Sequence, residues 1–363
     1  MHVLESPKKA FGVFFSIALA SFAFFGIGAD AGQAKTLLER AKGVFAPLPK
    51  DMATEQYPIT PERVSLGKSL FFDPRLSLDG TVACQNCHWP QLYGTDALKK
   101  SIGVEQRVNS RNAPTVLNAA LQFKAHWIGD RADIEEQAQK SLTGKASMGN
   151  PDTDTVVRKL KALGYEQAFK KAFPEDSDPL TPRNWGVAIG AYERTLTTPS
   201  PFDRYLEGEE RALSSKSKDG LLAFMNEGCI TCHNGVGVGG GSFQKFGLFG
   251  DYWLETGSAE IDQGRFEATK SPADKYVFKV PSLRNVAMTP PYFHDGSVEK
   301  LSDAVGMMSR LQLGKSLDEG TTAKILAFLE SLTGDMPKNF LLAPVLSPSP
   351  FTETLKEKSG RLK

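Results

Sequence analysis

The four cysteines of this 363-residue chain form two copies of one pattern. The copies are Cys84-Gln85-Asn86-Cys87-His88 and Cys229-Ile230-Thr231-Cys232-His233. A cysteine pair with this spacing, followed directly by histidine, is the motif that attaches haem c covalently. The thiols add to the haem vinyl groups, and the histidine becomes an iron ligand whose other ring nitrogen needs an acceptor. We therefore predict two haem c groups, with His88 and His233 as iron ligands.

Two other interpretations of the cysteines are a zinc site built from all four and a pair of redox dithiols. Neither requires a histidine directly after each cysteine pair. The chain has only 5 His, and two of them stand at those places. Haem attachment is therefore the preferred interpretation.

The N-terminal segment has the composition of an export signal. Lys8 and Lys9 precede an almost entirely apolar stretch over residues 10–28, and Ala29-Asp30-Ala31 offers the small residues that a signal peptidase recognises. The alternative is an uncleaved membrane anchor. We expect cleavage of residues 1–31 and a mature protein in the periplasm.

The composition is that of a globular protein, with 40% hydrophobic and 23% charged residues. The formal net charge is +1 and no Lys/Arg cluster stands out, so a nucleic-acid partner is not expected. The two motifs divide the chain, and we predict a domain over residues 33–206, a second over residues 207–344 and a tail over residues 345–363.

Helix signals dominate the pattern between the motifs. Thr60-Pro61 and Thr181-Pro182 each combine an N-cap with a proline at the first helical position. Residues 132–142 are rich in Glu, Gln and Ala. Ser316 and Glu319 predict a capping box for a helix that ends at Gly334. The glycine-rich run over residues 236–241 directly follows the second motif, so we interpret it as a turn near the second haem and not as a nucleotide loop.

With two haem motifs in place, the chain resembles the bacterial dihaem cytochrome c peroxidases and the related MauG-type enzymes from about Leu66 to Pro337. The segments that carry the resemblance are Arg111-Asn112-Ala113-Pro114-Thr115, Trp127 with Glu135-Glu136-Gln137-Ala138, Pro281-Ser282-Leu283-Arg284-Asn285-Val286, Pro291-Tyr292-Phe293-His294-Asp295-Gly296 and Gln312-Leu313-Gly314.

The resemblance implies a mainly α fold with two cytochrome c-like helical domains, each with one covalently bound haem c. His88 would bind the iron of an N-terminal peroxidatic haem, and His233 that of a C-terminal electron-transfer haem. Met308 would be the sixth ligand of the second haem, and it shares a helical stripe with Leu301 and Val305. Met307 is the rival ligand.

The resemblance also implies a calcium ion between the haems. Its ligands would be the Asn112 side chain and the carbonyls of Thr289 and Pro291, completed by waters. Trp127 would lie between the haems and relay electrons, whereas a packed aromatic is the alternative.

Two further residues are expected at the haem edges. His294 and Arg284 would bind haem propionates, with an ordinary structural hydrogen bond as the alternative for each.

The chain departs from the peroxidase pattern at two places. No histidine lies between His88 and His126, where many members carry a distal ligand, so we expect the first iron to be open. Ser147 stands where the peroxidases have a distal glutamate, and a serine hydroxyl cannot carry the proton of peroxide near neutral pH. We hypothesise that His126 replaces this glutamate as the acid–base group, with Gln137 positioning peroxide. His126 could instead be a packed or propionate-bonded residue, or an iron ligand.

Three functions follow as hypotheses. The first is reduction of hydrogen peroxide with electrons from a small exported cytochrome c or copper protein. The second is peroxide-dependent oxidation of an aromatic residue in a partner protein, as in MauG-type enzymes. The third is a dihaem electron carrier without catalysis. A homodimer is a further expectation from the resemblance.

Overall fold

The computed structural model describes residues 35–348, so the predicted export signal and residues 349–363 of the predicted tail lie outside the described residues. The α-helices of the described part are α1 (Leu37–Lys42), α2 (Pro61–Phe72), α3 (Ile134–Ser141), α4 (Thr153–Ala162), α5 (Glu166–Ala172), α6 (Pro182–Glu193), α7 (Pro201–Glu207), α8 (Ser215–Asn226), α9 (Tyr252–Thr256), α10 (Phe266–Thr269), α11 (Leu301–Leu313), α12 (Glu319–Glu330) and α13 (Lys338–Leu341).

Strand structure is confined to one small sheet in this part of the chain. Strands β1 (Phe243–Lys245) and β2 (Val277–Lys279) pair antiparallel, with Gln244 opposite Phe278. The cysteines of the motifs lie on two short 3-10 helices, η2 (Cys84–Asn86) and η7 (Cys229–Thr231), and on the residues that follow them. The prediction of a mainly helical fold is therefore confirmed.

The N-terminal caps of the helices show which sequence signals were sufficient to predict a helix start. Thr60 and Thr181 cap α2 and α6 as predicted, because their side chains accept hydrogen bonds from the backbone N–H groups of Arg63 and Asn184. The predicted capping box at Ser316 is wrong: Asp318 caps α12 and accepts from Thr321 N. A carboxylate closer to the first turn satisfies these N–H groups better. Helix α12 also ends at Glu330, before the predicted Gly334.

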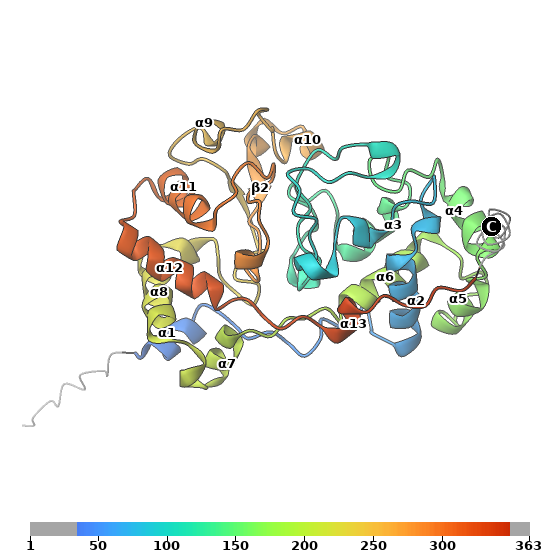
Figure 1. Ribbon diagram of the computed structural model, residues 1–363, viewed down its shortest axis with the longest axis horizontal. Coiled ribbons are helices and arrows are strands. Elements are labelled where there is room, and N and C mark those ends of the chain that lie inside the picture. The colour runs from blue at the N-terminus through green and yellow to red at the C-terminus, as the bar shows by residue number, and fades with distance from the viewer. Residues whose placement is uncertain (1–34, 349–363) are drawn as a thin grey trace, which may run out of the picture. The chain divides into compact units, whose positions relative to one another are not determined.

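Two helix crossings organise the protein. Helix α2 crosses α6 and α8 crosses α12, the two most extensive helix contacts beside that of α3 with α6 (Figure 1). A glycine lies at each crossing, because a Cβ at Gly67 would come 1.8 Å from the Ala188 carbonyl oxygen and one at Gly220 would come 1.9 Å from that of Lys324. Each crossing brings the helix before one haem motif against a helix that follows it.

The protein has two main hydrophobic cores, and each includes residues from the opposite end of the described chain. One core surrounds α2 and α6 and also contains Phe340 of α13, whereas the other surrounds α8 and α12 and also contains Phe45 and Phe202 from the N-terminal side of the predicted boundary. Figure 1 shows α1 beside α8 and α13 beside α6. Packing therefore does not follow the predicted boundary at residues 206 and 207, because α1 and α7 bury their apolar faces in the second core.

The two halves share a structural repeat. The same spacing along the chain separates Asn118 from Asn285, both left-handed with φ 57° and 61°, and His126 from Phe293, with φ 64° and 70°. It also separates the bridge Ala125–Arg131 from the bridge Tyr292–Val298, and the start of α3 from the start of α11. By this spacing Ser141 on α3 corresponds to Met308 on α11.

Between residues 35 and 348, no helix combines the length and the apolarity that a bilayer crossing requires.

Candidate functional site

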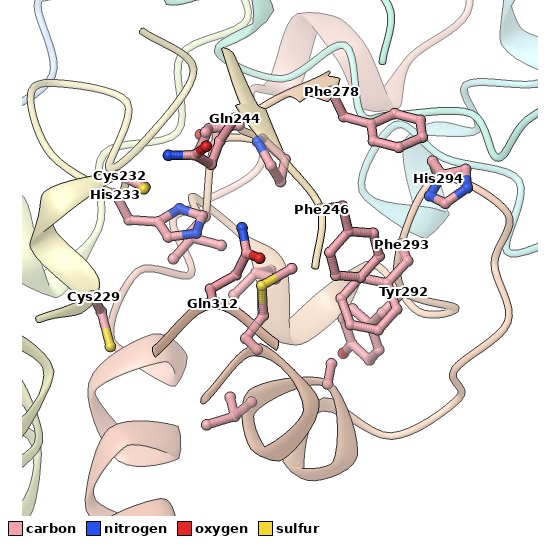
Figure 2. Close-up of a pocket in the computed structure, with 18 of the residues that line it drawn as sticks. Cys229, Cys232, His233, Gln244, Phe246, Phe278, Tyr292, Phe293, His294 and Gln312 are labelled. Carbon is pink, nitrogen blue, oxygen red and sulfur yellow. The ribbon is translucent and has the colours of Figure 1, made fainter. Parts of the chain in front are cut away.

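A cavity of about 330 Å³ lies beside the second cysteine motif. Its walls include Cys229, Cys232 and His233 on one side and Met308 on another, with segments of the first half closing it. Figure 2 shows His233 and Gln312 facing a common open centre, with Phe246, Phe293 and Tyr292 grouped across from the cysteines. The lining is predominantly apolar, which suits a flat hydrophobic cofactor.

The imidazole of His233 is prepared as a neutral ligand. Burial lowers its pKa to about 4, while the backbone carbonyls of Val238 and Pro281 oppose the shift. Its Nδ1 is buried without a well-aligned hydrogen bond. Gly239 lies against this ring, since a Cβ there would come 3.0 Å from Nδ1 and 2.2 Å from the Pro281 oxygen. The glycine-rich run thus lies against His233.

Helix α11 presents one of its two neighbouring methionines to the cavity. Met308 lines the cavity, whereas Met307 does not and packs instead in the cluster with Tyr292 and Val298. The geometry therefore favours Met308 over Met307 as a thioether ligand opposite His233.

The charges around the cavity fit a cofactor with carboxylates. Its lining contains no Asp, Glu or Arg, and Lys279 is its only lysine. A haem brings two propionates, so an apolar cavity with one buried cation and a neutral buried imidazole matches the group that the motif implies.

The first motif holds its histidine in a similar way. His88 Nδ1 lies 3.0 Å from the carbonyl oxygen of Gly94, which leaves Nε2 free. Burial lowers the His88 pKa, the carbonyls of Gly94 and Pro114 oppose this, and the charge of nearby His126 adds to the lowering. Both motif histidines are therefore neutral near pH 7, as iron ligation requires.

All four cysteines lie in the described residues, and all four are free of disulfides. Burial raises the pKa of the Cys84 thiol, and it raises the pKa of Cys87 and of Cys229 to about 11. Thiols with raised pKa values are poor thiolate ligands and slow redox nucleophiles. This disfavours the zinc and dithiol interpretations.

His126 forms a dyad with a carboxylate. Its backbone is left-handed, with φ 64°, and its Nδ1 lies 2.9 Å from Asp130 Oδ1. Although burial opposes it, the hydrogen bond and charge of His126 together with Arg131 lower the Asp130 pKa. Asp130 is therefore ionised and orients the imidazole. His126 lines the cavity beside the second motif, and its charge also acts on the His88 ring of the first motif.

Gln137 and Ser147 are engaged in local hydrogen bonds. Gln137 Nε2 donates to Ser141 Oγ at 2.9 Å, and Ser141 Oγ donates to the Gln137 carbonyl at 2.8 Å. Ser147 Oγ lies 2.8 Å from the carbonyl of Ser141 and 3.0 Å from that of Gly144. Ser147 therefore caps the end of α3, which agrees with its exclusion as a proton carrier.

Trp127 joins the two halves. Its Nε1 donates to the Asn112 carbonyl at 2.9 Å, and its own carbonyl accepts from Lys279 N at 2.7 Å. Its ring lies edge-on to that of His294, with centroids 6.4 Å apart. Trp127 is thus a packed aromatic in the cavity wall.

The three predicted calcium ligands line one cavity wall. Asn112, Thr289 and Pro291 all contact the cavity, and Asn112 Nδ2 lies 3.2 Å from the Pro291 carbonyl oxygen. Exchanging the amide nitrogen and oxygen of Asn112 by a flip would put its side-chain oxygen beside the Pro291 carbonyl oxygen. The described residues contain no cluster of three or more His, Cys, Asp or Glu side chains that could hold a metal.

The propionate predictions for Arg284 and His294 have different outcomes. Arg284 is not in the cavity wall, and its guanidinium donates to both oxygens of Asp203 at 2.9 Å and to the Val236 carbonyl at 2.6 Å. In this structure Arg284 therefore makes structural hydrogen bonds and a buried ion pair with Asp203, and it does not contact the cavity. His294 lines the cavity, stacks on Phe278 at 4.3 Å, and its buried Nε2 lacks a hydrogen-bond partner.

Sequence reasoning missed three groups at the site: Asp130, Lys279 and Gln122. Asp130 follows His126 by four positions, a spacing that would normally be read on a helix but here spans a turn. The repeat was also missed, although Pro114…Asn118 and Pro281…Asn285 share one spacing that a self-comparison would reveal.

The fold and the two motif histidines define a dihaem oxidoreductase, and comparison with known proteins identifies the family. The model of the family described as di-haem cytochrome c peroxidase matches residues 61–211. Cytochrome c551 peroxidase of Pseudomonas aeruginosa is 41% identical over 313 residues, which cover 84% of this chain and 89% of that protein. Methylamine utilization protein MauG of Methylorubrum extorquens is 38% identical over 247 residues, or 67% of each chain.

Solved structures agree with this assignment. A MauG-like protein associated with microbial copper homeostasis superposes with a TM-score of 0.69 at 28% identity, covering 84% of this chain and 97% of that one. The chain belongs to the dihaem cytochrome c peroxidase and MauG family and is a peroxidase-type oxidoreductase.

Proposed function

We propose that the chain is an exported enzyme with two covalently attached haem c groups, which reduces hydrogen peroxide to water with electrons from a small cytochrome or copper protein. Cys84, Cys87 and His88 would hold one haem, and Cys229, Cys232, His233 and Met308 the other. When bound, these haems supply an iron at which the O–O bond is cleaved and a second iron that stores an electron. Each turnover consumes one peroxide, two electrons and two protons and yields two waters.

One observation supports this division of labour. Met308 lines the cavity beside His233. The structural repeat places Ser141 at the position in the first half that corresponds to Met308. The Ser141 hydroxyl is already bonded to the Gln137 carbonyl at 2.8 Å. At this position helix α3 therefore offers no equivalent of the thioether, and a haem held by His88 would keep a coordination position for peroxide.

His126, whose charge acts on the His88 ring, would move the proton. With Nδ1 held by Asp130, its Nε2 can take a proton from bound peroxide and return it to the leaving oxygen. Trp127 lies in the wall between the halves and would pass electrons from the second haem to the first.

The test uses the haem-loaded protein in its resting ferric state. EPR should show one high-spin and one low-spin iron, and peroxide should shift the high-spin Soret band. H126A should slow this shift by roughly 10²- to 10⁴-fold, the range for a lost acid–base group. H126Q keeps a hydrogen bond to Asp130 but cannot titrate, so it should be equally slow. An unchanged rate in H126A would remove the acid–base role, and a new high-spin signal in it would mark His126 as an iron ligand.

A second candidate function is oxidation of an aromatic residue in a partner protein. The absence of a histidine between His88 and His126 favours it, and Met308 favours peroxide reduction. Rapid peroxide turnover with reduced cytochrome c would support the first function. Two low-spin irons that ignore peroxide would leave only an electron carrier.

We also propose a calcium ion at Asn112, Thr289 and Pro291 and a homodimeric assembly. Chelation with EGTA should lower the thermal midpoint of the loaded protein, and added Ca²⁺ should restore it. Light scattering of the purified protein measures the assembly.

A further inference from the structure

Lys279 is a buried cation that has no counter-charge among residues 35–348. Only 5% of the residue is exposed, and it forms no ion pair with any described carboxylate. Burial alone lowers its pKa to about 8. Removing an ammonium group from water without an anion is strongly unfavourable, so such groups are normally paired.

The position of this ammonium is fixed by the first half of the molecule. Its Nζ donates to the side-chain oxygen of Gln122, and its backbone N–H donates to the Trp127 carbonyl at 2.7 Å. The residue after Gln122, Phe123, bonds to Gly240 and stacks edge-on with Phe243 at 4.9 Å. Because Phe243 is the strand partner of Lys279, the lysine is held from both halves.

The cavity beside Lys279 needs an anion. Among the described residues that line the cavity with Cys229, Cys232 and His233, Lys279 is the only Lys, and none is Arg, Asp or Glu. Two residues beyond the end of β2, the Pro281 carbonyl lies near the His233 ring. The haem proposed at Cys229, Cys232 and His233 carries two propionates, and these would be the anions within the buried cavity.

We propose that the Lys279 ammonium, positioned by Gln122, binds a propionate of the haem at His233 and raises the reduction potential of that haem. The proposal rests on the assignment of two haems above. A fixed positive charge next to the propionate favours the ferrous state, which has one positive charge fewer than the ferric state. Lys279 would thus be a positioning and tuning residue that touches the cofactor and not the peroxide.

The experiment is a spectroelectrochemical titration of the loaded protein, followed at the band of the methionine-ligated haem. K279M removes the charge at similar length, and K279R retains it. In K279M we expect roughly a tenfold shift of the ferrous–ferric equilibrium toward ferric at pH 8, which lowers the midpoint by about 59 mV. In K279R we expect a ferrous–ferric equilibrium constant within about threefold of the native value, and therefore a nearly unchanged midpoint.

The pH dependence provides a readout that a structural role would not change. Without Lys279 the propionate loses its cation, so its pKa rises toward neutral. The reduced state then binds this proton more tightly, and the K279M midpoint should fall as pH increases from 6 to 8, where the native midpoint is flat. Q122L, which keeps the charge but loses its hydrogen bond, should give a smaller shift.

The outcomes are distinguishable from those of the peroxidase proposal. K279M protein that retains both haems and the native midpoint at pH 6 and pH 8 overturns the tuning role, even if its thermal midpoint is lower. Should K279M lose haem, the haem content of the variants decides. Haem retained in K279R but lost in K279M and K279Q supports the contact between the Lys279 ammonium and the propionate. Haem lost in all three variants overturns it. Two low-spin irons at rest would defeat the peroxidase function while leaving the midpoint comparison valid.

Discussion

At the scale of single residues, the chemistry proposed for the first haem depends on how His126 is held. A left-handed backbone at a non-glycine residue is uncommon and is retained where the surrounding structure requires it. Here the turn brings Asp130 to Nδ1 of a histidine that lies near enough to His88 for its charge to act on that ring. The carboxylate fixes both the tautomer and the orientation of the ring, as it does for catalytic histidines in general.

The first prediction concerns this carboxylate. D130N presents an amide that can donate to Nδ1 and so favours the wrong tautomer; we expect the rate of the peroxide-induced Soret shift to fall by roughly 10- to 100-fold. Stopped-flow absorbance measures this rate. R131Q is the matched control, because it removes the 2.6 Å pair between Arg131 and Asp130 but keeps the dyad. Equal rates in D130N and the native protein would contradict an orienting role.

The second prediction concerns Glu193, a buried carboxyl on α6 beside Cys84. Burial, with repulsion from Glu135, raises its pKa to about 8, and Arg194 opposes the shift. The folded state therefore binds the proton more tightly than the unfolded state, so stability is complete below about pH 4.5 and is lost as pH rises through 8. E193Q cannot ionise, and we expect it to be more stable than the native protein by roughly 4–5 kcal/mol at pH 9 and by less than about 1 kcal/mol at pH 5.

Urea unfolding of the loaded proteins at pH 5 and pH 9, followed by circular dichroism, tests this. E166Q changes an exposed glutamate on α5, and its free energy of unfolding should equal that of the native protein at each pH. A gain of stability for E193Q that is the same at both pH values would point to packing and not to ionisation.

At the scale of helices, the two crossings decide where the motifs lie. The third prediction is that G220A destabilises the protein by about 1–3 kcal/mol or more, since the added methyl would overlap the Lys324 carbonyl and push α8 from α12. G306A on α11 is the control: its new Cβ meets only the mobile end of Arg310 at 3.4 Å. It should be neutral or stabilising by about 0.5–1 kcal/mol, as expected for Gly to Ala within a helix. Thermal unfolding that ranks G306A at or below G220A would contradict the close-crossing argument.

The elements that sequence predicted correctly are those with local causes. Thr60-Pro61 and Thr181-Pro182 contain all that is needed to start a helix, and both helices begin there. The capping box at Ser316 failed because two candidate caps lie close together, and only the chain path shows that Asp318 meets the free N–H groups.

The site was predicted to the extent that motifs are contiguous. The cysteine pairs and their histidines needed no tertiary information, whereas the partners of Arg284 and Lys279 come from distant segments. Arg284 reaches Asp203 through the second core, and Lys279 reaches Gln122 across the halves. Such long-range pairs follow from packing, which no window of the sequence contains.

At the scale of the whole described chain, the repeat and the exchanged ends make the halves interdependent. Helix α1 lies in the core of the second half and α13 contributes Phe340 to the first, so neither half has a complete core by itself. Arg111 adds a bidentate pair from the first half to Asp262 in the second, at 2.7 and 2.8 Å. Loss of order in one half should therefore reach the other.

Thr198 lies where the two repeats meet. Its Oγ accepts from Asn118 Nδ2 at 2.7 Å and from Asn285 Nδ2 at 2.9 Å, and the residue is fully buried. These are the corresponding left-handed asparagines of the two halves, and each precedes the loop that carries a cavity residue, His126 in one half and His294 in the other. One hydroxyl thus fixes the start of both loops.

The fourth prediction is that T198V destabilises the protein by about 2–4 kcal/mol, because valine keeps the shape but leaves two buried amide donors unpaired at about 1–3 kcal/mol each. T198S keeps the acceptor and should lose much less. T197V removes only an exposed bond to the Lys50 carbonyl and should stay within about 0.5 kcal/mol of the native protein. Because both loops depend on Thr198, T198V should also broaden the EPR signals of both irons. A T198V protein with the urea midpoint of T197V, or with only one signal altered, would show that the halves are held independently.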